Sequence, residues 1–438
     1  MKFFLESHVL LIKGAYKAAL YDLKSGKVYS VSPAAKALLE KTEEGKSFDE
    51  LSSVNSFLGK LAVLDLGHFA EDGDPPAKIQ IPAPKPTLGM MWLSLNSNCN
   101  LECEHCYATS EPGPFDGSVP MTTVVRAIRE AREVFDLKCV QLIGGEPLLL
   151  GKHRVTTILK EAYDSGIPFL EIFTNGHLID EYYINLFRTL GVRVAISIYS
   201  DIAADHDAVT HQKGSWEKTV TAIRRVNSAG LSTRFGIVAM TANRNSVHRV
   251  APWLQQEFGV KVDKSYDVVR SCGRGSNADV IPWDLFKERH VRVSPDFQPV
   301  SIATVQKTMY GNVCWSDSVC ILPNGDVTPC EMEFANIQGN ITRNTLSEII
   351  LGEGGEKSQR LTKDKIQGCR DCEYRYACWE CRAMANNLDF TTFSKPLTCM
   401  YDPYTGEWES PPEKLSDHFP KLTTKRHLPI LSNVSPVI

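Results

Sequence analysis

Short apolar runs alternate with amphipathic stretches from about Met91 to Val269. The runs MWLSLN, CVQLIG, FLEIFT, VRVAISI, RFGIVAM and KSYDVV predict six strands. The stretches between them repeat their apolar residues at helical spacing and predict five helices, at 122–135, 155–165, 180–190, 215–229 and 246–258. Such alternation predicts a parallel sheet with helical crossovers, either open or closed as a barrel, and places functional loops at the carboxyl ends of the strands.

The residues before this series follow another pattern. ALYDLKSGKVYSV predicts two strands around a turn at Gly26, and SPAAKALLEKTEEG predicts a helix with Ser32 at its N-cap. A second helical pattern covers 48–64, and five prolines between Pro75 and Pro86 indicate extended backbone. We expect a small α+β module over 1–72, a proline-rich linker over 73–88, and the strand–helix domain over 89–300.

The last third of the chain is rich in cysteine. Eight of the thirteen cysteines lie between Cys314 and Cys399, where the alternating pattern is lost. An odd number of clustered cysteines favours metal binding over disulfides. We expect a separate, metal-organised domain over 301–403 and a C-terminal tail over 404–438.

Charge and hydropathy exclude several classes of partner. The net charge of −4 and the pI near 6.3 provide no basic field for nucleic acid. Glu6, His8 and Lys13 interrupt the N-terminal apolar segment, so it does not read as a signal peptide, and no later stretch is long and apolar enough to span a membrane. We expect a cytoplasmic protein that binds neither nucleic acid nor membrane.

The stretch CNLECEHCYA follows the first predicted strand and carries Cys99, Cys103 and Cys106. Three thiols leave a tetrahedral site one ligand short, so either a fourth donor comes from elsewhere or a position is open. This CxxxCxxC motif resembles that of the radical S-adenosylmethionine (SAM) superfamily, over about 88–274. The resemblance implies a [4Fe-4S] cluster on the three thiolates, with SAM bound to the fourth iron and cleaved reductively to a 5′-deoxyadenosyl radical. A zinc site with His105 as fourth ligand is the alternative.

Several other residues gain roles from the same resemblance. The GGEP motif is similar to the family's methionine-binding loop: its glycines let backbone approach the ligand, and Glu146 offers a carboxylate to the ammonium group. Strand-end polar residues are expected near the nucleoside. Arg270 and Arg274, past the sixth strand, are expected to bind a carboxylate of SAM or substrate, or to cap the barrel edge. The predicted SAM-binding residues are Gly144, Gly145, Glu146, Pro147, Thr174, Asn175, Ser197 and Arg270.

The C-terminal cysteines resemble the SPASM extension of radical SAM peptide and protein maturases. Family connectivity implies two auxiliary [4Fe-4S] clusters, which makes three clusters in all. Their ligands would be Cys314, Cys320, Cys330 and Cys381 for the first, and Cys369, Cys372, Cys378 and Cys399 for the second. The CWEC spacing between Cys378 and Cys381 is one residue shorter than is usual in the family. Two zinc ions on the same eight thiols are the alternative.

Two features bear on the reaction. The N-terminal module resembles the PqqD-like, winged-helix-like element that recognises leader peptides in maturases of ribosomally made peptides, although a generic stabilising cap would show the same pattern. Cys272 lies past the sixth strand, where a thiol could donate a hydrogen atom to a substrate radical, or be an inert loop residue.

Together these features predict an α/β protein: a partial (β/α)6 TIM-like barrel between an α+β module and an iron–sulfur SPASM domain. We expect an oxidoreductase that abstracts hydrogen from a precursor peptide and installs a thioether or carbon–carbon crosslink. Its expected partners are that peptide with its leader and an electron donor such as flavodoxin or ferredoxin. The alternatives are a sulfatase-type protein maturase, a peptide epimerase that uses Cys272, and a non-catalytic metal-binding peptide scaffold.

Overall fold

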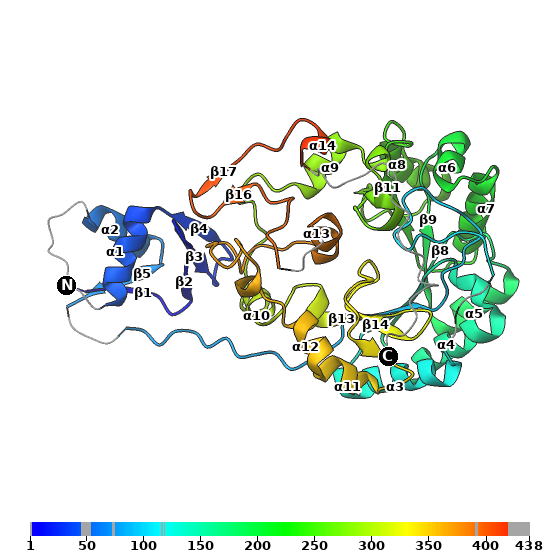
Figure 1. Cartoon of the computed structure of the whole chain (residues 1–438), viewed down its shortest axis with the longest axis horizontal. Helices are drawn as coiled ribbons and strands as arrows, with labels where there is room; N and C mark the ends of the chain where they lie inside the picture. The colour runs from blue at the N-terminus through cyan, green and yellow to red at the C-terminus, as the bar shows by residue number, and fades with distance from the viewer. Residues whose placement is uncertain are drawn as a thin grey trace, which may run out of the picture.

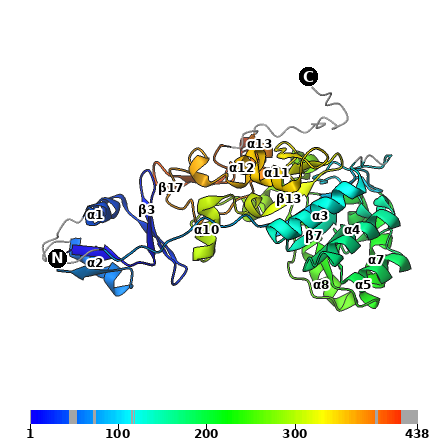
Figure 2. The ribbon, with the colours of Figure 1, turned by 90° about the horizontal axis from the view of Figure 1, so that it is seen from below.

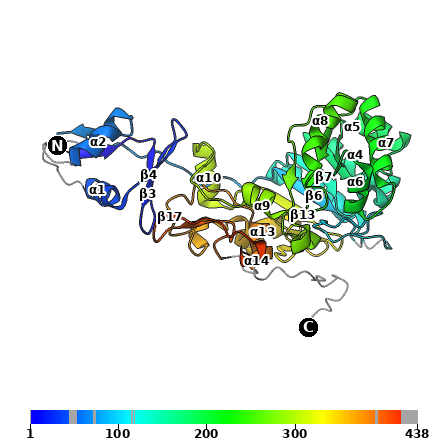
Figure 3. The same ribbon diagram turned by 90° about the horizontal axis from the view of Figure 1, so that it is seen from above.

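The computed structural model describes residues 2–44, 54–71, 75–114, 117, 119–389 and 393–418. The molecule is elongated, with the N-terminal module at one end and the strand–helix domain at the other (Figures 1, 2 and 3). The cysteine-rich domain lies between them.

The N-terminal module holds two antiparallel sheets and two helices. β2 (Val9–Lys13), β3 (Ala18–Asp22) and β4 (Val28–Val31) form one sheet, and β1 (Lys2–Leu5) pairs with β5 (Gly67–Ala70) in the other. The predicted hairpin is present, and the Ser32 side chain accepts the Ala35 N–H at 3.3 Å to cap α1 (Pro33–Glu43). α2 covers Val54–Val63, and the first residues of the predicted second helix lie outside the described residues. The pattern did not predict β1, β2 or β5.

The proline-rich segment runs along the cysteine-rich domain (Figure 1). Between 75 and 88 it forms no helix or strand. The carbonyl oxygens of Ile81 and Pro82 accept hydrogen bonds at 2.8 and 2.7 Å from Tyr310 and Gln306 of α10 (Ile302–Tyr310). The segment is therefore tied to the domain that it passes.

Five parallel strands form one side of the main sheet, from its edge at β10 inward to β6, and follow the chain order that the pattern predicted. They are β6 (Met90–Ser94), β7 (Cys139–Ile143), β8 (Phe169–Thr174), β9 (Arg193–Ser197) and β10 (Thr233–Gly236). The helices that connect them or follow β10 are α3 (Met121–Phe135), α4 (Lys152–Asp164), α5 (Glu181–Leu190), α6 (Ala203–Thr210), α7 (Ser215–Ser228) and α8 (Val247–Phe258). Only α6 was not predicted.

The barrel is not closed. The fifth apolar run is broken at Ile237 into β10 and β11 (Val238–Ala239), and the sixth strand, β12 (Asp267–Val268), pairs with β11 in a separate two-stranded sheet. The predicted α/β class with a partial barrel is confirmed.

The two faces of the main sheet differ in polarity. Val140, Leu142 and Ile172 belong to a buried apolar core shared with the helices. On the opposite face, Gln141, Glu171 and Arg193 are neighbours in the strand register. Glu171 is buried there, and its Oε2 accepts from Arg234 Nε at 2.9 Å.

The cysteine-rich domain extends this sheet. β13 (Ser318–Ile321) pairs in parallel with β6, and β14 (Asp326–Thr328) and β15 (Gly339–Asn340) follow antiparallel. Val319 and Ile321 belong to the same core cluster as the strand–helix domain. These two apolar side chains are enough to continue the core into the cysteine-rich domain, although the sequence of that domain shows no alternating pattern.

Short elements complete the chain. The helices are α9 (Trp283–His290), α11 (Leu346–Leu351), α12 (Glu353–Gln359), α13 (Arg382–Asp389) and α14 (Leu415–His418), and β16 (Tyr401–Asp402) pairs with β17 (Glu407–Trp408). Single 3-10 turns cover Pro147–Leu150, Gly273–Ser276, Ala278–Val280, Trp315–Asp317 and Lys363–Lys365. None of the helices among the described residues is long and apolar enough to cross a membrane.

Candidate functional site

The loops after β6 and β7 are in direct contact. The Gly145 and Glu146 N–H groups donate to the carbonyl oxygens of Asn96 and Asn98 at 2.9 and 3.0 Å. A Cβ on Gly145 would lie 1.9 Å from the Asn98 oxygen, and Gly144 has a φ of 123°. Both positions therefore require glycine because the loop packs tightly against the segment that leads into Cys99. This contact lies within the protein, whereas the sequence suggested close approach to a ligand.

Glu146 joins the β7 loop to the end of β8. Its Oε1 accepts from Thr174 Oγ1 at 2.7 Å and from the Leu148 N–H at 3.0 Å, while Oε2 accepts from the Asn175 N–H at 3.0 Å. The side chain is almost fully buried, and Pro147 begins the 3-10 turn that follows it. The protein already uses this carboxylate, so its predicted bond to an ammonium group stays a prediction.

The three motif cysteines lie in one loop with backbone N–H groups directed at two of the sulfurs. Leu101 N–H donates to Cys99 Sγ and Ser110 N–H to Cys106 Sγ, each at 3.4 Å. Burial, and after it the charge of Glu146, raises the pKa of Cys99 to about 12, and burial raises the pKa of Cys103 further. Such thiols ionise at neutral pH only when a metal centre binds them.

Arg274 holds this cysteine loop from the side of β12. Its Nε donates to the Cys103 carbonyl at 2.9 Å, its Nη2 to the Ser110 carbonyl at 2.5 Å, and its own N–H to the Cys106 carbonyl at 3.0 Å. The sequence suggested a carboxylate partner for Arg274, but its partners are backbone oxygens of the loop that carries the thiols.

His105 packs against an aromatic ring. Its ring centroid lies 4.9 Å from that of Tyr199, edge to face, and burial lowers the pKa of His105 to about 4. Within the described part of the chain, no three Cys, His, Asp or Glu side chains are close enough to bind a single metal ion. The packing of His105 against Tyr199 and its lowered pKa suit a core residue better than a fourth zinc ligand.

The remaining predicted residues fall into two places. Thr174 and Asn175 adjoin the cysteine loop, where Asn175 Nδ2 donates to Asn100 Oδ1 at 2.7 Å, and Ser197 lies half-buried at the end of β9. Arg270 instead pairs with Asp267 at 3.3 Å and contacts Met332 Sδ at 3.9 Å. Cys272 is 1% exposed, so the structure does not present its thiol to a substrate, and its role as a hydrogen donor stays a prediction.

The four cysteines assigned to the first auxiliary cluster come together. Burial, and then the charge of Glu331, raises the pKa of Cys330, with further contributions from Cys381 and Cys320. The pKa of Cys381 is raised to about 11, chiefly by burial, and Cys314 contributes to that shift. Cys381 therefore lies near Cys330 and Cys314, although its spacing from Cys378 is short.

The four cysteines assigned to the second cluster form their own group. Burial raises the pKa of Cys369 to about 12, and Cys378 and Cys399 add to the effect. The pKa of Cys372 is raised by burial first and then by its neighbours, which include the same two thiols. The Tyr374 N–H donates to Cys372 Sγ at 3.4 Å, as the Met332 N–H does to Cys330 Sγ at 3.5 Å.

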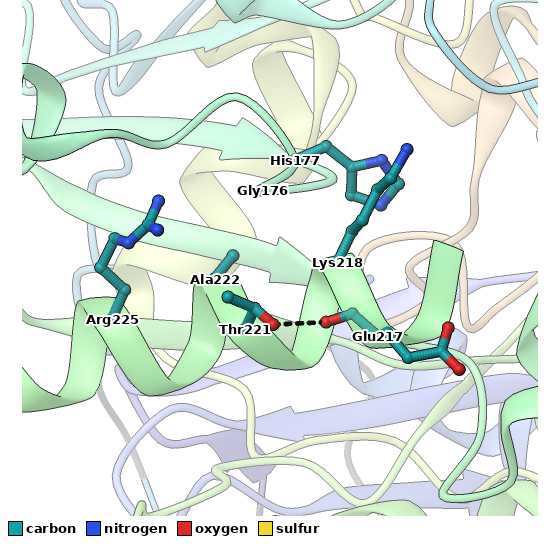
Figure 4. A pocket seen from close by; sticks show the side chains of 7 residues that line it. All are labelled: Gly176, His177, Glu217, Lys218, Thr221, Ala222 and Arg225. Carbon is teal, nitrogen blue, oxygen red and sulfur yellow. Dashed lines mark hydrogen bonds between the residues drawn. The ribbon is translucent and has the colours of Figure 1, made fainter. Parts of the chain in front are cut away.

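A cavity of about 230 Å³ lies apart from all these thiols (Figure 4). It lies between the turn at Gly176 and His177 and the exposed side of α7, where Lys218 and Arg225 line it. It contains none of the cysteines, so it is not the site that the motifs predict.

Two family models match the chain. Residues 93–253 match the radical SAM superfamily, and residues 314–373 match the SPASM model, described as an iron–sulfur cluster-binding domain. The chain is a radical SAM enzyme with a SPASM domain. SAM and iron–sulfur clusters are its cofactors, and the trio and the GGEP loop lie within the first match.

The curated relatives have several activities. An AdoMet-dependent heme synthase from Nitratidesulfovibrio vulgaris is 24% identical over 76% of this chain and 95% of its own length. The antilisterial bacteriocin subtilosin biosynthesis protein AlbA of Bacillus subtilis is 26% identical over 58% of each chain. The sporulation killing factor maturation protein SkfB of the same organism is 25% identical over 59% of this chain and 63% of its own. The chain thus spans about three-fifths of the length of AlbA and SkfB.

Solved structures share the fold at low sequence identity. Streptococcus suis SuiB bound to S-adenosylmethionine superposes with a TM-score of 0.53 at 13% identity, over 90% of this chain and 99% of its own. Native anSMEcpe with bound AdoMet gives 0.54 at 14% identity, over 73% of this chain and 94% of its own. The radical SAM/SPASM fold of this enzyme is therefore shared with structures that hold SAM.

Some contacts of this radical SAM enzyme had no signal in the sequence. Arg274 was expected to bind a carboxylate, but only the fold brings its loop to the cysteines. Asn96, whose Nδ2 donates to the Asn98 and Glu146 carbonyl oxygens at 2.9 and 3.2 Å, precedes the motif by three residues. The one sequence feature that pointed to a role for Asn96 was its position at the end of the first predicted strand.

Proposed function

We propose that this enzyme is a maturase of a ribosomally made peptide, in which it installs a thioether or carbon–carbon crosslink. AlbA and SkfB support this, since their names place them in bacteriocin biosynthesis and in the maturation of a killing factor. SuiB supports it through the fold, because one of its solved structures is bound to the precursor peptide SuiA.

The observation that carries the proposal is the N-terminal module. The superposition with SuiB covers 90% of this chain, which cannot be reached without residues that precede the proline-rich segment. A small antiparallel sheet with two helices is suited to holding an extended peptide, because an edge strand offers unpaired N–H and C=O groups. We propose that the module is PqqD-like and that a leader peptide pairs with an edge of its β2–β3–β4 sheet.

The thiols would hold three [4Fe-4S] clusters. Cys99, Cys103 and Cys106 would bind the one that takes SAM, and the two C-terminal groups of four would bind the auxiliary pair. The buried thiols and the N–H groups directed at sulfur fit such clusters. When bound, the cofactors supply the electron and the 5′-deoxyadenosyl radical that removes a hydrogen atom from the substrate.

The chain's own residues position these groups. Glu146 keeps the β7 loop on the end of β8, and Arg274 keeps the cysteine loop in place. The polar face of the sheet, with Glu171 and Arg234, offers hydrogen-bonding groups to a peptide segment. We also propose a cytoplasmic location and a flavodoxin or ferredoxin as the electron donor.

The first test is anaerobic reconstitution of the whole chain, followed by reduction in the presence of SAM. The wild type should hold about twelve irons and release 5′-deoxyadenosine. A Cys99→Ala, Cys103→Ala, Cys106→Ala triple variant should hold about eight irons and release none. Zinc in place of iron, or undiminished 5′-deoxyadenosine from the variant, would refute the proposal and favour the non-catalytic scaffold.

The second test uses small genetically encoded peptides as substrates. A crosslink removes two hydrogen atoms from the peptide, which mass spectrometry detects. Epimerisation through Cys272 would leave the mass unchanged in water and incorporate deuterium from heavy water. A folded protein converted in place of a peptide would support the sulfatase-type alternative.

A heme-forming reaction is the second candidate. The heme synthase relatives match 76% and 70% of this chain, more than AlbA or SkfB do. We favour the peptide substrate because the superposition with SuiB covers 90% of this chain and so includes residues of the N-terminal module. Heme formed by the reconstituted enzyme from a porphyrin precursor, with no peptide modified, would decide for this candidate.

A further inference from the structure

A lysine is buried beside the second auxiliary group of thiols. Lys363 is 8% exposed and begins a 3-10 turn six residues before Cys369. Its Nζ is buried and has no hydrogen-bond partner. An ammonium group carries three donors, and leaving them unsatisfied in the interior costs several kcal/mol.

The nearest carboxylate does not satisfy this charge. Glu380 Oε1 lies 3.8 Å from Lys363 Nζ, beyond hydrogen-bond distance, and it accepts instead from Arg382 Nε at 2.9 Å. Glu380 is thus engaged by Arg382, and both side chains are buried. The Lys363 ammonium therefore lacks a hydrogen-bonding anion of its own.

At least one thiol of the second group lies near the ammonium. Lys363, Glu380 and Cys378 line one small internal cavity. Burial lowers the pKa of Lys363, but the charges of Cys378, Glu380 and Cys369 outweigh it and raise the pKa overall. In return Lys363 lowers the pKa of Cys369 and of Cys399, against the effect of burial.

We propose that Lys363 is a positioning residue whose ammonium group lies against the second auxiliary cluster, donates to its sulfur ligands and raises its reduction potential. A cluster on four thiolates carries net negative charge, and it is the anion that the buried lysine lacks. A fixed cation favours the reduced cluster, because reduction adds a further negative charge.

Glu380 has the opposite effect. It directly precedes Cys381, a proposed ligand of the first cluster, and its charge also acts on Cys369 of the second group. A fixed anion beside a cluster disfavours reduction, so Glu380 should lower the potentials of both clusters. This inference rests on the proposed cluster content.

The test measures reduction potentials, not turnover, in a background that carries the triple alanine replacement of the SAM-cluster cysteines. That protein holds only auxiliary clusters, and a Cys372→Ala variant identifies the signal of the second one. Lys363→Met keeps the length of the side chain and removes its charge. Lys365→Met is the matched control, since Lys365 is exposed on the same turn.

Lys363→Met should lower the potential of the second cluster and leave that of the first almost unchanged, while Lys365→Met should change neither. Glu380→Gln should raise the potential of the second cluster. An unchanged potential in Lys363→Met with full iron content would overturn the inference. If Lys363→Met does not retain its iron, an unchanged second-cluster potential in Glu380→Gln would overturn it instead. A background protein without auxiliary iron would refute the proposed cluster content and is distinguishable from both results.

Discussion

The phenol of Tyr21 donates a hydrogen bond to the carbonyl oxygen of Glu373 at 3.0 Å, across 352 positions of the chain. It also accepts the Ala377 N–H at 3.2 Å. Both partners lie between Cys372 and Cys378, so a residue of the N-terminal module holds two points of a loop that carries proposed cluster ligands. Tyr21 is fully buried in an apolar cluster with Tyr374 and Tyr401. The N-terminal module and the second auxiliary site therefore share one core.

Tyr21→Phe should destabilise this junction. The ring still fits, but the Ala377 N–H and the Glu373 carbonyl lose their buried partner, at a cost of about 1–3 kcal/mol. Chemical denaturation should show a lower midpoint, and the iron of the second auxiliary site should dissociate faster. Tyr16→Phe serves as the control, since Tyr16 is 46% exposed. Equal midpoints and equal iron loss for the two variants would show that the phenol does not hold the loop.

Gly145→Ala should prevent the cysteine loop from closing on the β7 loop. The added Cβ would meet the Asn98 carbonyl oxygen at 1.9 Å, and backbone must move to relieve the contact. Overpacking of this kind typically costs about 1–3 kcal/mol. The variant should lose about four irons per chain and the release of 5′-deoxyadenosine. Gly113→Ala is the matched control, because a Cβ there meets nothing within 4 Å; full iron content in Gly145→Ala would contradict the prediction.

The amphipathic pattern predicted the strand–helix domain well, because a parallel sheet between helices needs apolar residues at regular positions. Each of the five predicted helices is present to within a few residues. The pattern could not predict that β13 would join the sheet beside β6. A four-residue strand among cysteines has no clear period, and its place depends on which edge of the sheet is free.

The candidate site shows the same division. Cys99, Cys103 and Cys106 could be named from local spacing, and GGEP from its order after the second strand. The roles of Arg274, Lys363 and Tyr21 could not be predicted, since each acts on a segment that is distant in sequence. For Glu146 the sequence pointed to the carboxylate, but its partners Thr174 and Asn175 become visible only in the fold.

Arg274→Lys should weaken the cysteine loop while keeping the charge. A lysine cannot reach the Cys103 and Ser110 carbonyl oxygens with the fixed fork of a guanidinium group. Losing one such charge-assisted hydrogen bond costs about 1.5–3 kcal/mol, which corresponds to a tenfold or greater weakening of loop closure. The rate at which a chelator removes iron from the SAM-binding site should rise accordingly. Arg244→Lys is the control, since Arg244 pairs with Asp284 at 2.6 Å on the surface, and equal rates for the two variants would count against this role.

His206 should make stability depend on pH near neutrality. The Tyr199 N–H donates to His206 Nδ1 at 3.3 Å, so this nitrogen must stay unprotonated in the folded protein. Burial lowers the pKa of His206 to about 4, below the usual value near 6.5. As the pH falls below about 6.5, the unfolded chain takes up a proton that the folded protein does not, and stability is lost by up to about 1.4 kcal/mol per pH unit down to about 4.

A His206→Gln variant should therefore be less stable than the wild type at pH 7.5. The difference in the free energy of unfolding between the two proteins should be about 1 kcal/mol smaller at pH 5.5. Comparing the two proteins at each pH cancels the contributions of the other buried histidines. Urea denaturation midpoints at pH 7.5, 6.5 and 5.5 provide the measurement, with His153→Gln as an exposed replacement on α4. Because His206 packs on Tyr199, and Tyr199 on His105 between two motif cysteines, protonation of His206 would act on the loop that carries the SAM cluster. If the difference in the free energy of unfolding stayed constant between pH 7.5 and 5.5, His206 would not be kept neutral by its burial.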